Sequence, residues 1–119
     1  MNGQILQGEI YYILSAAHMF NPEKKRSGTP AVVVSNNDIN AGDSHVEVVF
    51  LTRRNMYEKN THVKVSHEAI KGSTALCEQI CAVSKYRVGD YIGPTTEGEF
   101  ESIRIACMHS LGLWEEVAL

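Results

Sequence analysis

RSGTPAVVVSNN, residues 26–37, joins a basic, glycine-containing loop to an unbroken apolar run and then to a polar stop. Residues 31–35 do not alternate between apolar and polar side chains, which is typical of a strand buried on both faces. Pro30 fits the first position of such a strand. The next stretch, NNDINAGDS at 36–44, is rich in residues that favour turns. The quoted stretch therefore predicts a buried strand between a basic loop and a turn.

Four further stretches have the composition of β-strands. They are rich in β-branched and aromatic residues, and residues that favour turns separate them. The predicted strands cover residues 8–14, 46–54, 61–66 and 74–84. The strand at 61–66 alternates, which predicts His62 and Lys64 on one face. The strand at 74–84 is unusual because the polar pair Glu78 and Gln79 stands in its middle.

The C-terminal segment changes to a helical period. Thr96 and Glu99 fit a capping box, in which each side chain accepts a hydrogen bond from the other residue's backbone amide. Apolar residues then recur at helical spacing, namely Phe100, Ile103, Cys107, Leu111 and Trp114. Five strands and one terminal helix predict a mainly β (α+β) fold, a small and strongly bent β-barrel with the helix packed on it.

Length and composition bound the class of protein. A chain of 119 residues with 44% hydrophobic content suits one compact domain, residues 1–119. No apolar run approaches the roughly 20 residues of a membrane-spanning helix, and the N-terminus has no signal-peptide pattern. We therefore expect a cytoplasmic protein that does not bind a membrane.

The three cysteines predict neither a disulfide framework nor a metal site. On one strand, Cys77 and Cys81 would lie about 13 Å apart, too far for a disulfide. No second cysteine or histidine pair completes a zinc-binding pattern. We expect reduced cysteines and no metal or other cofactor.

Polar residues stand at or beside the ends of the predicted strands. Arg26 precedes the second strand, Thr52 ends the third, and Arg53 and Arg54 follow it. In a small barrel such positions meet at one rim, where arginines bind phosphate groups and carboxylate or amide groups read unpaired bases. The implied chemistry is metal-free phosphoryl transfer on RNA, in which a 2′-hydroxyl attacks the phosphate and cations stabilise the developing charge. Motifs of other common catalytic classes are absent from the sequence.

Six short motifs resemble a known family. GEIYYI, PAVVVSNN, VVFLT, THV, STALCEQI and SLGL stand in the order and approximate spacing of the MazF/PemK-type toxins of bacterial toxin-antitoxin systems. The motifs extend over residues 8–113, and STALCEQI is the most distinctive.

The resemblance implies an SH3-like barrel of about five to seven strands with a C-terminal helix, forming a homodimer. It implies a sequence-specific, metal-independent endoribonuclease that cuts single-stranded RNA, leaving a 2′,3′-cyclic phosphate and a 5′-hydroxyl. It also implies a cognate antitoxin that covers the RNA groove. An acidic antitoxin segment would use the same basic patches as the RNA backbone.

The resemblance also suggests roles for single residues. Thr52 matches the family's strand-end threonine and would orient the reacting phosphate or hydroxyl; alternatively it makes only a strand-end hydrogen bond. Glu78 and Gln79 match residues that contact bases; alternatively they form a buried, hydrogen-bonded pair. The remaining predicted RNA-binding residues are basic, namely Lys25, Arg53 and Arg54.

The sequence departs from the family at its catalytic arginine. That arginine stands immediately before the proline, where this chain has Thr29. Threonine has no positive charge, so Arg26, or Arg53 from the adjacent rim, would have to supply the cation. Two hypotheses follow: a ribonuclease with a remodelled loop, in which Arg26 and Thr52 are catalytic, or a catalytically impaired module that binds RNA or a protein target.

Overall fold

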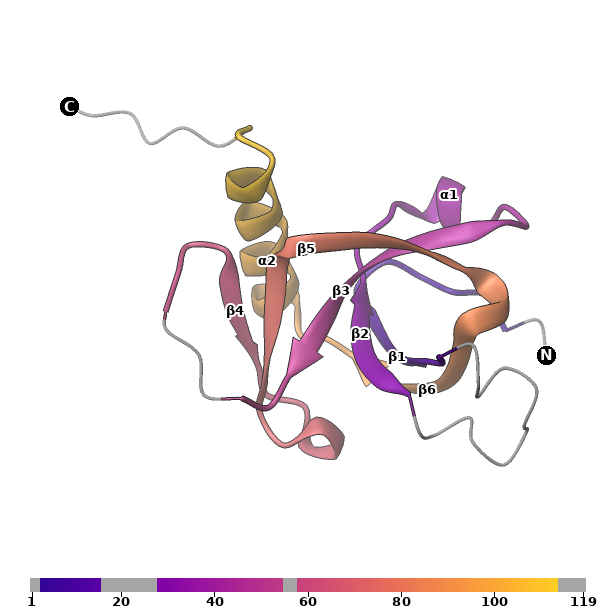
Figure 1. The fold of residues 1–119 in the computed structure, drawn as a ribbon, viewed down its shortest axis with the longest axis horizontal. Helices are drawn as coiled ribbons and strands as arrows, with labels where there is room; N and C mark the ends of the chain where they lie inside the picture. The colour runs from indigo at the N-terminus through magenta and orange to yellow at the C-terminus, as the bar shows by residue number, and fades with distance from the viewer. Residues whose placement is uncertain (1–2, 16–27, 55–57, 114–119) are drawn as a thin grey trace.

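The computed structural model describes residues 3–15, 28–54 and 58–113, which form a bent antiparallel sheet with a long helix beside it (Figure 1). The strands are β1 (Glu9–Ile13), β2 (Thr29–Val33), β3 (His45–Thr52), β4 (His62–Val65), β5 (Ser73–Ser84) and β6 (Val88–Pro94). Short helices lie between strands, namely α1 (Asn37–Asn40), η2 (Glu68–Ile70) and η3 (Lys85–Arg87), and α2 (Glu97–Ser110) follows β6. The prediction of a mainly β protein with a C-terminal helix is confirmed.

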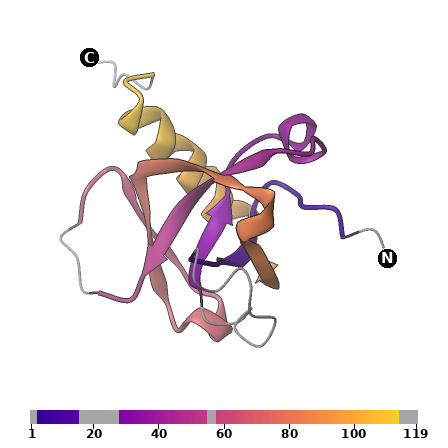
Figure 2. The same ribbon diagram turned by 45° about the vertical axis from the view of Figure 1, so that its right-hand side comes forward.

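The sheet is strongly rolled. Its strands are hydrogen-bonded in the order β4-β5-β3-β2-β1-β6, and each neighbouring pair is antiparallel. The long β5 bends near its middle and leads through η3 to β6, on the far side of β1 (Figures 1 and 2). Within the described residues β4 and β6 are the two edges and do not pair. The expected barrel is therefore an open roll.

The two edges of the roll approach each other through a side chain. His67 lies between β4 and η2, and its ring packs against β6, because a Cβ placed on Gly93 would lie 2.3 Å from His67 Nε2. Only glycine leaves room for the ring at this position. The β4–β5 connection thus covers the edge strand β6 without extending the hydrogen-bonded ladder.

The sequence did not predict β6 as a strand. Its residues, VGDYIGP, include two glycines, an aspartate and a proline, all of which are depleted in strands. The structure accommodates them because β6 is an edge strand that pairs only with β1, through two register irregularities.

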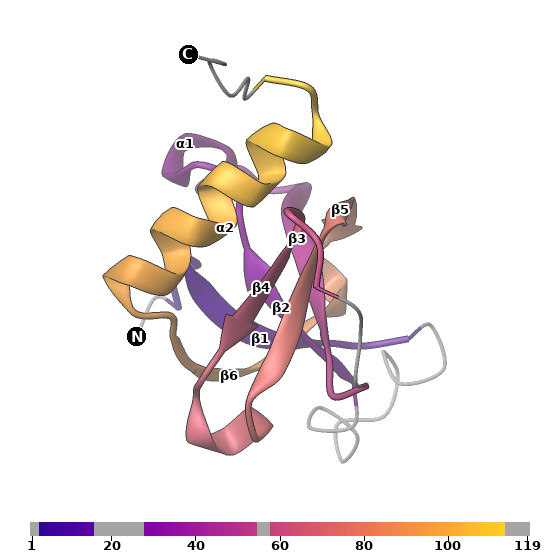
Figure 3. The same ribbon diagram turned by 90° about the vertical axis from the view of Figure 1, so that its left-hand side faces the viewer.

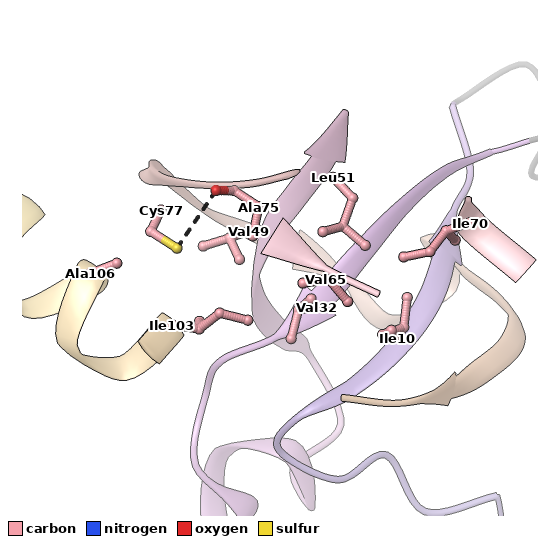
Figure 4. Close-up of a cluster of buried hydrophobic side chains, with 10 residues drawn as sticks. All are labelled: Ile10, Val32, Val49, Leu51, Val65, Ile70, Ala75, Cys77, Ile103 and Ala106. Carbon is pink, nitrogen blue, oxygen red and sulfur yellow. Dashed lines mark hydrogen bonds between the residues drawn. The ribbon is translucent and has the colours of Figure 1, made fainter. Parts of the chain in front are cut away.

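Two hydrophobic clusters cover the two faces of the sheet. The first joins the sheet to α2 and η2, with residues Ile10, Val32, Val49, Leu51, Val65, Ile70, Ala75, Cys77, Ile103 and Ala106 (Figure 4). The second lies on the opposite face, with residues Tyr11, Ile13, Ala31, Val33, Val46, Val48 and Val83. Adjacent residues of β2 belong to different clusters, which confirms the prediction that this strand is buried on both faces.

The helix α2 begins at the predicted capping box. Thr96 Oγ1 accepts from the Glu99 N–H at 3.1 Å, and Glu99 Oε1 accepts from the Thr96 N–H at 3.0 Å. Glu99 Oε2 also accepts from the backbone N–H and the hydroxyl of Ser66, just after β4. One carboxylate therefore starts the helix and ties it to the sheet, along which α2 then runs (Figure 3).

The apolar stripe of α2 agrees with the sequence as far as Cys107. Ile103 is buried, and Phe100 and Cys107 pack against the first cluster, whereas Leu111, just after the helix, is 62% exposed. Trp114 lies outside the described residues. The stretch at 36–44, expected as a turn, contains the short helix α1, whose first turn is capped by the side chain of Asn36.

Candidate nucleic-acid interface

A row of polar side chains crosses three neighbouring strands where β3 ends. Thr52 of β3 pairs with Thr74 of β5, and Thr74 pairs with Lys64 of β4. Directly opposed residues of antiparallel strands project their side chains from the same face. Lys64 is exposed and both threonines are partly exposed. This Thr52–Thr74–Lys64 row therefore presents two hydroxyls and one ammonium group on one face.

The neighbouring strand β2 begins at the same end of the sheet. Ala31 of β2 pairs with Phe50 of β3; Thr29 stands two residues before Ala31 and Thr52 two residues after Phe50, beyond the last paired residues of the two strands. Thr29 is exposed and begins β2. The position at which the resemblance predicts an arginine is thus at the same end of the β2–β3 pair as Thr52, and its side chain carries a neutral hydroxyl.

Two arginines follow the row directly. Thr52 Oγ1 accepts a hydrogen bond from the backbone N–H of Arg54 at 3.1 Å, which turns the chain as it leaves β3. Arg53 and Arg54 are exposed, and neither forms an ion pair with another described residue. Their guanidinium groups are therefore available to an external anion.

A pocket of about 330 Å³ opens beside the start of β2. It is lined by Tyr12, Gly28, Pro30, Leu51, Arg53, Ala69, Ile70 and Ser73. Gly28 shapes its rim, because a Cβ there would lie 2.2 Å from the backbone oxygen of Ile13. Arg53 lines this pocket together with Leu51, a residue of the first cluster, whereas Thr52, which stands between them in the chain, projects from the other face of β3. The pocket and the threonine row therefore lie on opposite faces of the sheet at the same strand end.

Glu78 and Gln79 lie at an irregularity of β5. Between the pairs Val49–Ile80 and Leu51–Ala75, β5 has four residues where β3 has only Phe50. Both polar residues are exposed, so the alternative prediction of a buried polar pair is wrong. Burial does not alternate along β5 at this point, because the consecutive residues Glu78 and Gln79 both face solvent.

His62 is the side-chain partner of Glu78. Its Nε2 lies 3.2 Å from Glu78 Oε2, and the exposed fractions of the two side chains are 5% and 33%. Partial burial of Glu78 opposes its ionisation, but hydrogen bonds from its own backbone and from the His62 and Thr61 side chains outweigh this and lower its pKa. Glu78 is therefore a carboxylate at neutral pH, held by a buried ring.

Two predicted site residues cannot be compared with this geometry. Arg26 and Lys25 lie outside the described residues, so their approach to the threonine row stays a prediction. The structure places Arg53 at the pocket and Thr52 in the threonine row, and it places Glu78 in contact with β4, the strand that also carries Lys64.

Sequence reasoning did not single out Thr74, Lys64 and His62 as site residues. Thr74 is the first residue of an apolar stretch and has no local signature. The alternation of THVKVS did predict that His62 and Lys64 share a face, and their pairing with Leu76 and Thr74 agrees with it. Only the strand order of the structure shows which residues of β5 lie beside His62 and Lys64.

The described residues contain no cluster of three His, Cys, Asp or Glu side chains that would hold a metal ion. The three cysteines are free. No helix in the described segments has the length and apolar character needed to cross a membrane.

The side chains described above supply hydroxyls, guanidinium and ammonium cations, and one carboxylate to this surface. Such a set binds phosphate through the cations and hydroxyls and accepts hydrogen bonds from bases through the carboxylate.

Comparison with solved structures gives proteins of the same fold. An endoribonuclease from a mycobacterial species is 24% identical, with a TM-score of 0.76, over 95% of this chain and 97% of its own. A mycobacterial endoribonuclease in complex with its cognate antitoxin has the same identity and TM-score, over 94% and 99%. A MazE-MazF complex from Deinococcus radiodurans is 14% identical, with a TM-score of 0.73, over 95% and 100%.

Comparison with curated protein sequences gave no significant match. The model of one protein family, described as the PemK-like, MazF-like toxin of type II toxin-antitoxin systems, matches residues 6–111. That match includes every described strand and the whole of α2. The chain therefore belongs to the PemK-like, MazF-like toxin family of type II toxin-antitoxin systems.

Proposed function

We propose that this toxin is a sequence-specific, metal-independent endoribonuclease that cleaves single-stranded RNA. One observation carries the proposal: at the end of β3 the hydroxyl of Thr52 is followed by two exposed arginines, of which Arg53 lines a pocket at the start of β2. Phosphate binding needs cations and hydroxyl donors in this arrangement. Family membership and the endoribonucleases of the same fold add support.

In the proposed reaction the RNA supplies its own nucleophile. The 2′-oxygen attacks the adjacent phosphorus and loses its proton, while the bond to the 5′-oxygen breaks and that oxygen takes up a proton. The products are a 2′,3′-cyclic phosphate and a 5′-hydroxyl. Thr52 donates its hydroxyl hydrogen to a phosphate oxygen, and guanidinium groups stabilise the extra negative charge of the transition state.

The principal cation of this proposal is Arg26, from the loop before β2. It replaces the family arginine that is missing at Thr29, and Arg53 assists from the pocket. Lys25 and Arg54 bind phosphates on either side of the cut, while Glu78 and Gln79 contact bases. Exposed cations with no ion pair among the described residues support this assignment for Arg53 and Arg54.

Further parts of the proposal concern assembly. The toxin acts in the cytoplasm as a homodimer and is blocked by a cognate antitoxin. Solved structures of the same fold include an endoribonuclease in complex with its cognate antitoxin and a MazE-MazF complex, which support an antitoxin as a partner. An apolar groove between α2 and the sheet ends at the exposed Leu111, which suits association with another chain.

The test is cleavage of a long single-stranded RNA by the purified toxin in the presence of EDTA. We expect cleavage that leaves cyclic phosphate ends and that falls strongly in Arg26→Ala and in Thr52→Ala. Arg104→Ala is the matched control, because Arg104 is exposed on α2 and bound to Glu101. Intact RNA after incubation with the wild type would refute the proposal.

A second candidate function is supported by Thr29. A neutral side chain at the position of the family arginine weakens the case for catalysis but leaves the basic surface in place. The chain would then be a binding module for RNA or for a protein target. RNA that is retarded on a gel but not cut would identify the RNA-binding module; RNA neither cut nor retarded would indicate a protein target.

A further inference from the structure

A buried histidine that contacts a surface carboxylate is unusual among the polar groups of this fold. The His62 side chain is 5% exposed, whereas the Glu78 side chain is 33% exposed. Burying an imidazole ring away from water requires hydrogen-bond partners, and one of them is the Glu78 carboxylate, 3.2 Å from Nε2. The contact thus fixes the orientation of the carboxylate, which remains partly exposed and whose oxygens have further lone pairs to accept hydrogen bonds from a ligand.

The backbone around Glu78 is shaped to display this carboxylate. Four residues of β5 oppose a single residue of β3 at this point, so Glu78 is released from the β3 ladder. On the other side, the Cys77 N–H donates to the Thr61 oxygen at 2.9 Å, which keeps the preceding residue attached to the chain entering β4. Extra residues in a strand are known to redirect side chains next to functional sites.

His62 also controls what Glu78 is able to bind. An ionised carboxylate only accepts hydrogen bonds, and a lowered pKa keeps Glu78 in that form at neutral pH. The Nε2 atom of His62 must then carry a hydrogen and donate it to Oε2. The Thr61 side chain is a second donor to the same carboxylate. Both donors restrict the rotation of the Glu78 side chain.

A fixed acceptor distinguishes bases by their edges. Guanine presents two adjacent donors on its Watson–Crick edge, which match the two oxygens of a carboxylate. Uracil presents one donor between two carbonyl oxygens, and a carboxylate repels those oxygens. The partly exposed carboxylate of Glu78 therefore favours guanine over uracil.

We propose that His62 is a positioning residue that holds the Glu78 carboxylate at the bend of β5 so that it selects guanine, and rejects uracil, at one nucleotide of the RNA. This inference rests on the proposed ribonuclease function. It assigns His62 no contact with the RNA; the histidine acts only through Glu78.

The experiment uses a random-sequence RNA pool, the purified full chain and EDTA. Sequencing of the fragment ends gives the base frequencies at each position around the cut. For the wild type we expect guanine enriched and uracil depleted at one position. Glu78→Gln should reduce that guanine-to-uracil ratio about tenfold, the scale of one good base contact. Glu101→Gln, a substitution on α2 far along the chain, is the control and should leave the profile unchanged.

Two histidine variants separate positioning from folding. His62→Leu fills the buried space but donates no hydrogen bond, so we expect the guanine preference to weaken at the same position as in Glu78→Gln. His62→Gln retains a hydrogen-bond donor, so we expect this variant to keep most of the guanine preference. Titration of Glu78 by carboxyl NMR is a readout without RNA: its pKa should rise in His62→Leu toward its ordinary value.

The outcomes are distinguishable. If the wild type cuts RNA but Glu78→Gln keeps the same base profile, the inference is wrong and the proposed function stands. If His62→Leu slows cutting equally at all sites and leaves the pKa of Glu78 unchanged, His62 has only a packing role and the positioning is refuted. If the wild type neither cuts nor retards the pool, both the proposed function and this inference fail.

Discussion

Thr52, the last residue of β3, lies directly opposite Thr74 of β5. The two residues are 22 positions apart in sequence, and Lys64 of β4 is opposite Thr74 on its other side. The hydroxyl of Thr52 is therefore flanked by a second hydroxyl and then by a cation on one face of the sheet. This relationship makes the strand end suitable for an anionic ligand.

Substitution at Thr52 tests whether its hydroxyl takes part in the reaction. We expect Thr52→Val to lower the cleavage rate about tenfold to a hundredfold, because a hydrogen bond to a charged group contributes about 1.5–3 kcal/mol. Thr52→Ser keeps the hydroxyl and should retain most of the activity. The measurement is the initial rate of cutting of a fluorescent RNA. Equal rates for Thr52→Val and the wild type would show that the hydroxyl only caps the strand.

Replacement of Thr29 tests whether the missing charge limits RNA binding. Thr29 is exposed and begins β2, at the same end of the β2–β3 pair as Thr52, so Thr29→Arg adds a guanidinium at the position of the family arginine without burying it. We expect tighter binding of single-stranded RNA and a salt dependence steeper by about 0.7 per decade of salt, the value for one more phosphate contact. Binding is measured by fluorescence anisotropy over a range of salt concentrations.

The control for Thr29→Arg is Ser102→Arg, which adds the same charge on the exposed face of α2. It should change RNA affinity much less. If both variants bind RNA more tightly by the same factor, net charge accounts for the effect, and the position of Thr29 has no special importance.

Glu99 predicts a pH-dependent contribution to stability. Partial burial opposes ionisation of Glu99, but hydrogen bonds from Thr96 and Ser66 outweigh this and lower its pKa below the ordinary value of 4.5. A group whose pKa is lowered in the folded state stabilises the fold above its unfolded pKa and loses that contribution as the pH falls through its folded pKa. The free energy that Glu99 contributes should therefore be complete at pH 7 and vanish in acid.

We expect Glu99→Gln to reduce the free energy of unfolding by about 1–2 kcal/mol at pH 7. The difference from the wild type should shrink below pH 4.5. Denaturant unfolding of both proteins at several pH values measures this difference in the free energy of unfolding. Glu101→Gln is the matched control on the same helix, because its exposed pair with Arg104 contributes little. A difference for Glu99→Gln that is constant with pH would contradict the assignment.

The cysteines should react at very different rates. Cys77 is buried, and its hydrogen bond with Cys107 and its burial both raise the pKa of its thiol. Cys81 is exposed four residues further along β5. Because thiolates are the reactive form, we expect an alkylating reagent to label Cys81 rapidly and Cys77 only slowly.

Peptide mass spectrometry over time measures each labelling rate. All three cysteines should react quickly in denaturant, which serves as the control. Rapid labelling of Cys77 in the native protein would show that α2 separates readily from β5, in contrast to the packing described above.

Several features of the fold follow from local patterns. The apolar run at 31–33 is buried on both faces, and the capping box at Thr96 begins α2 as predicted. Both patterns act over a few residues, through side-chain burial or a short hydrogen-bonded loop. The strand β6 was missed because its glycines and proline are tolerated only at a sheet edge, and a local pattern does not identify the edge.

The candidate site, like the fold, was predicted only in part from local patterns. Sequence alone singled out Thr52, Arg53, Glu78 and Gln79, through their place at strand ends and within an apolar stretch. It did not indicate that the polar pair is exposed, because the four residues of β5 that oppose Phe50 are an irregularity of pairing rather than of composition.

By itself the sequence determined five of the six strands, the burial of β2, the start of α2 and the chemical groups of the candidate site. Tertiary structure alone decided which of those groups are neighbours: Thr52 with Thr74 and Lys64, and His62 with Glu78. The physical reason is that strand order and register depend on pairing between distant segments. Their free energy comes from burying the two faces of the whole sheet rather than from any one stretch.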